Sequence, residues 1–169
     1  MATWLRSSFN DIIVAVRTRL IDVTGLPIDR VKITAKRQWA HYQADQLLNL
    51  VPQTITRNVQ VADGSGRIMT QIERQLWVQC VNRLATDTID DGTQWFIDET
   101  YGLITLEENV LDALTDWRPV DDSQNALTIE PVKFLAGVPP IQEIEMPGWG
   151  QETLAFNIIY APPLNQDYQ

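Results

Sequence analysis

Two segments of the chain repeat apolar residues at the spacing of one face of an α-helix. The first covers residues 8–24, where Ser8 can cap the start and Gly25 and Pro27 can end the helix. Its apolar stripe consists of Phe9, Ile12, Ile13, Val16 and Leu20. We therefore predict an amphipathic helix whose stripe packs on a core.

The second helical segment follows Thr105–Glu108, a sequence typical of a capping box. In such a box the threonine accepts a hydrogen bond from the third amide, and the glutamate reaches back. Pro119 is expected to end this helix. Its apolar stripe consists of Leu106, Val110, Ala113, Leu114 and Trp117.

Alternating apolar and polar residues predict β-strands elsewhere in the chain. The clearest strand covers residues 67–81, where Arg74 interrupts the apolar face and Trp77 lies on the polar face. Pro131 predicts an edge position or a bulge for its own strand. The other strands are predicted at residues 31–35, 54–62, 127–134 and 153–160.

Turn residues and irregular stretches separate these elements. Residues 63–66 form a turn that joins two predicted strands into a long hairpin, and residues 90–92 form another turn. Residues 37–53 have no clean period and are predicted to be irregular, with one helical turn near residues 45–48. Residues 137–150 are rich in proline and glycine, which predicts a loop.

The order of these elements favours an α+β fold, a mostly antiparallel β-sheet with two main helices packed on one face. The length of 169 residues fits one domain, which we place at residues 1–161. A polar tail at residues 162–169 is expected to be disordered. No signal peptide and no apolar run long enough to cross a membrane is present, so no membrane partner is expected.

The charge and the single cysteine narrow the function further. A net charge of −9 argues against a direct grip on DNA, because phosphate binding requires clustered lysine and arginine. Cys80 is the only cysteine, so no intrachain disulfide can form, which fits a reducing compartment. Its place in the predicted strand 67–81 favours a buried, inert thiol over a reactive one.

No set of residues has the spacing of a catalytic or metal-binding site. His41 is the only histidine, and no Gly-x-Ser-x-Gly elbow accompanies it. The glycines at residues 64–66 lack the lysine and the spacing of a phosphate-binding loop. Adjacent carboxylates such as Asp121 and Asp122 point in different directions and lack the pattern of a calcium loop. We expect no enzymatic activity, no cofactor and no metal.

Candidate contact residues remain at the hairpin tip and among the tryptophans. The glycines of the tip allow it to adapt to a partner, and its arginine can pair with an acidic neighbour. Tryptophan is enriched at protein interfaces, although a local packing role stays equally open for Trp77. The candidate interface residues are Asp63, Gly64, Ser65, Gly66, Arg67, Trp77 and Trp149.

Several of these patterns occur together in one known family. The opening helix ends in Thr24-Gly25-Leu26-Pro27, and the long hairpin covers residues 54–81. Further matching segments are residues 95–102, 106–114, 125–131 and 154–160. Nearly the whole chain thereby resembles the tail terminator proteins of long-tailed bacteriophages, the group that includes the lambda minor tail protein of that role. The resemblance rests on packing patterns and gives no counterpart for residues 37–53 and 137–150.

The resemblance implies a hexameric ring at the head-proximal end of the tail tube, which stops tube polymerisation and joins the tail to the neck. The implied partners are further copies of this chain, the tail tube protein and a neck stopper or connector protein, with the tail sheath as an additional candidate. DNA would pass through the lumen without specific binding. The chain would be made in the bacterial host cytoplasm and reside in the virion.

Three other functions stay open at this point. The chain could be another neck component, such as a stopper or head–tail connector, which shares the assembly role. It could be an enzyme, which a polar constellation converging in a pocket would favour. It could also be a small adhesion or binding module.

Overall fold

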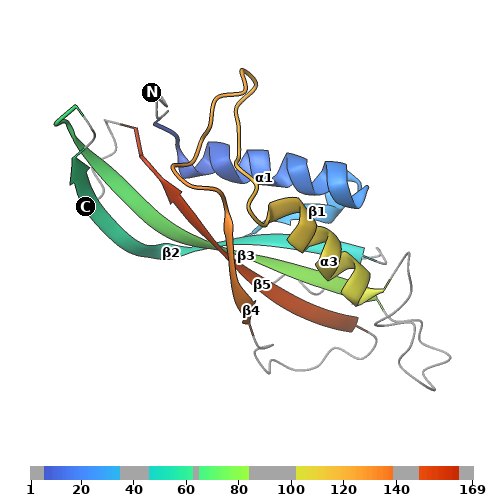
Figure 1. The fold of residues 1–169 in the computed structure, drawn as a ribbon. Helices are drawn as coiled ribbons and strands as arrows, with labels where there is room; N and C mark the ends of the chain where they lie inside the picture. Colours follow the sequence, from blue (N-terminus) through green and yellow to red (C-terminus); the bar gives the residue numbers. More distant parts are fainter. Residues whose placement is uncertain (1–5, 35–45, 63–64, 84–101, 139–148, 164–169) are drawn as a thin grey trace.

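A computed structural model of the chain describes residues 6–34, 46–62, 65–83, 102–138 and 149–163. These residues form a five-stranded sheet of order β1-β2-β3-β5-β4, with two α-helices on one face (Figure 1). Strand β1 runs parallel to β2, and the other neighbours are antiparallel. The predicted α+β fold is confirmed. The elements are α1 Phe9–Thr24, the short 3-10 helix η1 Ile28–Arg30, β1 Val31–Ile33, β2 Gln46–Ala62, β3 Ile68–Arg83, α3 Leu103–Leu114, β4 Lys133–Val138 and β5 Trp149–Tyr160.

Helix α1 forms as the sequence predicts. The hydroxyl oxygen of Ser8 accepts a hydrogen bond from the backbone N–H of Asp11 at 3.2 Å, which satisfies one of the amides exposed at a helix start. Gly25 ends the helix with a φ of 70°, a left-handed conformation that glycine adopts without steric cost. All five residues of the predicted apolar stripe are buried.

Helix α3 starts two residues before the predicted capping box. Gly102 occupies the N-cap position and makes no side-chain cap hydrogen bond, while Thr105 lies inside the first turn. The capping-box prediction is therefore wrong. Leu103 explains the earlier start, because the added half-turn buries this side chain to 3% exposure. The helix also ends at Leu114, earlier than the predicted stop at Pro119.

Strand β2 corrects the prediction of an irregular segment with a helical turn near residues 45–48. Residues 46–51 are strand, and every one of their side chains is buried. A strand covered on both faces shows a continuous apolar run instead of alternation, so its period is hidden in the sequence. The hairpin strands are accordingly longer than predicted, and their register runs from Gln46 opposite Asn82 to Ala62 opposite Ile68.

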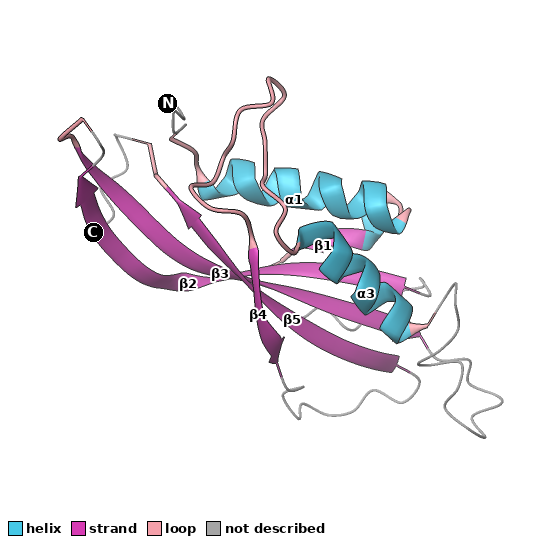
Figure 2. Cartoon of the chain, in the orientation of Figure 1, coloured by secondary structure: helices cyan, strands magenta, loops and turns pink. Residues whose placement is uncertain are grey.

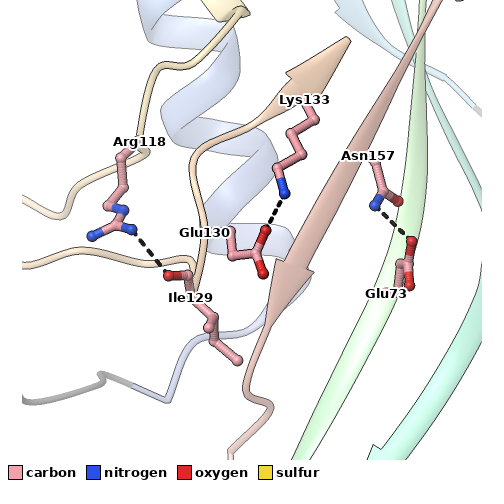
Figure 3. Close-up of polar contacts among 6 residues, drawn as sticks. All are labelled: Glu73, Arg118, Ile129, Glu130, Lys133 and Asn157. Atoms are coloured by element: carbon pink, nitrogen blue, oxygen red, sulfur yellow. Dashed lines mark hydrogen bonds and ion pairs between the residues drawn. The ribbon is translucent and has the colours of Figure 1, made fainter. Parts of the chain in front are cut away.

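The strand predicted at residues 127–134 is displaced toward the C-terminus. Residues 127–130 form bends, and β4 runs over Lys133–Val138, which includes the first two residues of the predicted 137–150 loop. Pro131 lacks a backbone N–H and cannot donate to a ladder, so continuous pairing starts after it. Ahead of it, the Ile129 N–H donates to the Ile159 carbonyl of β5 at 2.8 Å. A side-chain contact helps to hold these bends in place. Arg118 Nη2 donates a hydrogen bond to the Ile129 carbonyl at 3.0 Å (Figure 3).

The core lies between the helices and the sheet face beneath them. Strand β5 behaves as predicted, with Leu154, Phe156, Ile158 and Tyr160 all at most 1% exposed. The Tyr160 ring lies 5.4 Å from the ring of Phe9, which connects β5 to the first turn of α1. Figure 2 shows that the layers are one sheet and one helical layer, so one core supports the whole described fold.

Some predictions concern residues that the structure does not describe. They concern His41, the turn at residues 90–92, residues 95–101 of the segment that matches the resembled family, and the tail beyond residue 163. Among the residues that are described, no helix is both long enough and apolar enough to cross a membrane.

Candidate assembly surfaces

The paired ends of β2 and β3 form an arm that projects past the helical layer (Figure 1). We define the arm as residues 54–62 and 65–71, and none of these side chains is buried. Its large apolar side chains include Ile55, Val61 and Ile68, which are 37%, 39% and 68% exposed. A two-stranded ribbon that nothing covers is only marginally stable in water. Exposed apolar side chains on both of its strands indicate a surface that a partner can cover.

The root of the arm is held rigidly to the body. The Arg74 guanidinium Nε donates to the Gln53 carbonyl at 2.5 Å, and its charged carbon lies 4.4 Å from the centre of the Phe9 ring. This arrangement explains the interruption of the apolar face that the sequence shows at Arg74. The register shifts between Pro52, Ile55 and Arg57 leave that carbonyl free to accept the bond.

A second polar contact ties the arm root to β5. Asn157 Nδ2 donates to Glu73 Oε1 at 2.6 Å, and Figure 3 shows this bond crossing from β5 to β3. The Thr56 hydroxyl donates to the Glu73 carbonyl at 3.0 Å, which joins the two strands of the hairpin at the same level. The arm therefore leaves the body in a defined direction, as a contact element must.

The predicted interface residues fall in different surroundings. Ser65, Gly66 and Arg67 lie exposed at the end of the arm, and Gly66 has a φ of 80°, the left-handed conformation expected of a turn glycine. Asp63 and Gly64 lie outside the described residues, as does the side chain of Trp149, whose backbone begins β5. The interface role of all these residues remains a prediction.

Trp77 is half-buried on the sheet face opposite the helices. It lies in register between Val51 of β2 and Ala155 of β5, which are 9% and 5% exposed. Its indole N–H donates to Gln75 Oε1 at 3.3 Å. The indole of Trp77 therefore lies among buried neighbours and keeps part of its surface accessible. A packing role and an interface role both remain open for it.

A groove that the sequence did not predict lies between α1 and the loop at residues 115–132. It has a volume of about 740 Å³. Apolar atoms come from Val14, which is 56% exposed, and from Ala15, Trp117 and Leu127. The single sequence signal was Val14, an apolar residue on the otherwise polar face of α1. The charged residues that line the groove are Arg6, Asp11, Arg19, Asp22, Asp121 and Asp122.

The loop side of the groove is a structured turn. Asp121 Oδ1 accepts from the backbone N–H groups of Ser123 and Asn125 at 2.9 and 2.8 Å, and Oδ2 accepts from the Asn125 side chain at 3.0 Å. These bonds lower the pKa of the Asp121 carboxyl, with the Asn125 side-chain amide as the largest cause. Asp121 is therefore a structural acid, ionised at neutral pH.

The groove has no catalytic arrangement within the part of the chain that the structure describes. The buried Ser7 hydroxyl lines it without a hydrogen-bond partner, and the Ser8 hydroxyl is engaged with Asp11 at 2.6 Å. Nucleophilic catalysis needs a hydroxyl within hydrogen-bond reach of a base. The Ser7 hydroxyl has no such partner, and Ser8, which does contact the Asp11 carboxylate, caps α1 and does not line the groove. No group of three potential metal ligands occurs among the same residues.

Cys80 is fully buried in β3, and burial raises the pKa of its thiol well above the ordinary range, with Glu107 and Glu152 adding to the shift. The prediction of a buried thiol is confirmed. We expect an aromatic disulfide reagent at pH 8 to leave native Cys80 unmodified and to titrate one thiol after denaturation, because the thiolate is the reactive form. Modification in the folded protein at the rate of the unfolded chain would contradict this burial.

No protein-family model and no curated protein sequence matches this chain. Among solved structures it is similar to a chain in the virion of a native gene transfer agent particle. The two share 14% sequence identity at a TM-score of 0.53, over 88% of this chain and 92% of the other. This similarity shows a shared fold.

Proposed function

We propose that this chain is a structural, non-enzymatic protein of a phage-like virion and that it acts as the tail terminator. Copies of the chain would form a ring, of about six members by the family resemblance, at the head-proximal end of the tail tube. The ring would stop tube polymerisation and present its other surface to the neck proteins.

The observation that carries this proposal is the fold shared along nearly the full length of both chains with a component of a virion particle. The similarity covers 88% of this chain and 92% of the other, so it concerns the whole described fold and not a local motif. The sequence resemblance to tail terminators supports the finer assignment independently of this comparison.

The surfaces of the described residues suit assembly. A closed ring needs two different patches on each copy, because a heterologous contact joins unlike surfaces. The chain offers the arm on one side and the outer strand β4 on another, where Phe134 and Leu135 are 38% and 47% exposed. Exposed apolar residues on an edge strand favour pairing with another chain.

The net charge suits the same role. With a charge of −9, the protein surface repels the phosphate backbone at short range. DNA could then move through the ring without being held at any one position.

The test is native mass spectrometry of the purified protein, alone and with purified tail tubes. We expect a ring of about six copies, either free or formed only on the tube end. A single copy that ignores tubes and binds the head connector would assign the chain to the stopper role instead. A single copy that binds neither would overturn the virion assignment.

A further inference from the structure

We propose that the groove between α1 and the 115–132 loop receives the arm of a neighbouring copy of this chain. The proposal rests on the proposed ring and adds which two surfaces meet in it. The donor surface is the arm at residues 54–62 and 65–71, and the acceptor is the groove.

Charge complementarity is the first argument. The groove is lined by four aspartates and two arginines, a net charge of −2. The whole hairpin segment 54–71 contains Arg57, Arg67 and Asp63, a net charge of +1 on a chain of −9. The arm is thus a basic element of an acidic protein, and it meets opposite charge in the groove. Complementary potentials steer association and fix its register.

The groove keeps negative charge available for a partner. Asp121 is consumed by its own turn, and Arg19 donates to the Ala113 carbonyl at 3.3 Å while lying 5.8 Å from the centre of the Trp117 ring. Asp22 and Asp122 line the groove and make no side-chain hydrogen bond or ion pair with other residues that the structure describes. They are the acids placed to meet an incoming guanidinium.

Apolar and polar side chains in the groove fit the same occupant. Val14 offers exposed apolar surface of the kind that Val61 and Ile68 of the arm also expose. Ser7 also lines the groove, and its hydroxyl is buried without a hydrogen-bond partner. A volume of about 740 Å³ lies within the range of pockets that hold a small ligand, so it admits a few side chains of one strand.

The arm would occupy the groove of a second copy, because no described arm residue lines the groove of its own chain. Its side chains are exposed or half-buried, and Figure 1 shows the arm leading away from the helical layer. Arm and groove are different surfaces, so the contact repeats from copy to copy and can close a ring.

A charge swap tests the pairing. Arg57→Glu and Asp122→Arg are made singly and together, and the concentration at which copies associate is measured by analytical ultracentrifugation, alone and on tail tubes. Each single change is expected to weaken association about tenfold, and the double change to restore most of it, because like charges then become opposite again. Asp29→Arg, which reverses an exposed aspartate outside the groove, serves as the matched control and should leave association unchanged.

Each other outcome decides between the proposals. Unchanged association of both single variants, or a double variant no better than the singles, would overturn the arm–groove contact and leave the terminator function standing. Loss of tube binding with intact self-association would assign the groove to the tube protein and also overturn it. A wild-type protein that never associates, alone or on tubes, would overturn the proposed function itself.

Discussion

Replacing Phe156 with alanine is expected to destabilise the fold by about 3–5 kcal/mol. The Phe156 side chain is 0% exposed and lies on β5, in register with Leu76 of β3 and Phe134 of β4. Its removal leaves a cavity at the centre of the sheet that rigid neighbouring strands cannot fill. Since native domains are stable by only about 5–15 kcal/mol, a fall of roughly 6–20 °C in the melting temperature is expected.

Phe134 provides the matched control for this change. Its ring lies 5.7 Å from the Phe156 ring, but the residue is 38% exposed on the edge strand. Phe134→Ala should therefore cost only about 1 kcal/mol. Urea unfolding followed by tryptophan fluorescence measures both variants. Equal losses in the two would contradict the position of Phe156 at the centre of the core.

Elements with one buried face could be predicted from the sequence. In α1 the apolar residues recur at a single period, because one side of the helix packs on the core and the other does not. In β5 both faces are buried, but Thr153 and Asn157 are polar, so the alternation of apolar Leu154, Phe156, Ile158 and Tyr160 is still visible in the sequence. The start and end of α1 were also predictable, since Ser8 and Gly25 act through short-range hydrogen bonds and a backbone conformation that only nearby residues determine.

Elements whose state depends on distant residues could not be predicted. Residues 46–51 are buried on both faces by the rest of the fold, so no local period marks them as strand. The start of α3 depends on the burial of Leu103 in the folded protein, and the capping residues in the sequence give no indication of that burial. The displacement of β4 depends on contacts of residues 127–132 with Trp117, Arg118 and Ile159, such as the Val132 N–H that donates to the Trp117 carbonyl at 2.8 Å.

The two candidate assembly surfaces also differ in whether local residues determine them. The hairpin and its glycine-rich tip were visible in the sequence, because turn residues between two alternating runs define a hairpin locally. The groove was not, because it joins α1 to a loop about a hundred positions later in the chain, and only the fold brings the two together. The sequence showed Asp121 and Asp122 as adjacent carboxylates without the pattern of a calcium loop, and it gave no sign of the groove that both of them line.

The body and the arm contribute to different properties of the protein, the body to folding stability and the arm to assembly. The body holds the core, whereas the arm is joined to the body at its root, where Arg74 and Glu73 make hydrogen bonds. Residues that add little to folding but retain exposed apolar surface are of the kind that assembly interfaces use. Stability and assembly should therefore respond to different substitutions in this protein.

Removing the outer part of the arm, which includes its tip and Ile68, is expected to abolish assembly while leaving the fold intact. Residues 60–70 would be replaced by Asn-Gly, a pair that favours a two-residue hairpin turn between Val59 and Gln71, which are already opposite each other. Because the described side chains of this range, at residues 60–62 and 65–70, are exposed or half-buried, the melting temperature should change by no more than about 4 °C. Native mass spectrometry with tail tubes should then detect only single copies.

Point substitutions separate a loss of contact from a general effect of chain shortening. Ile68→Ser changes an arm residue that is 68% exposed, and Ile28→Ser changes a residue of similar exposure, 62%, in η1. Only the arm substitution should weaken association, by about tenfold, because a buried isoleucine at an interface contributes roughly 1.5–3 kcal/mol. If the shortened protein and Ile68→Ser both assembled as the wild type does, the arm could not be the contact element, and β4 would become the surface to test.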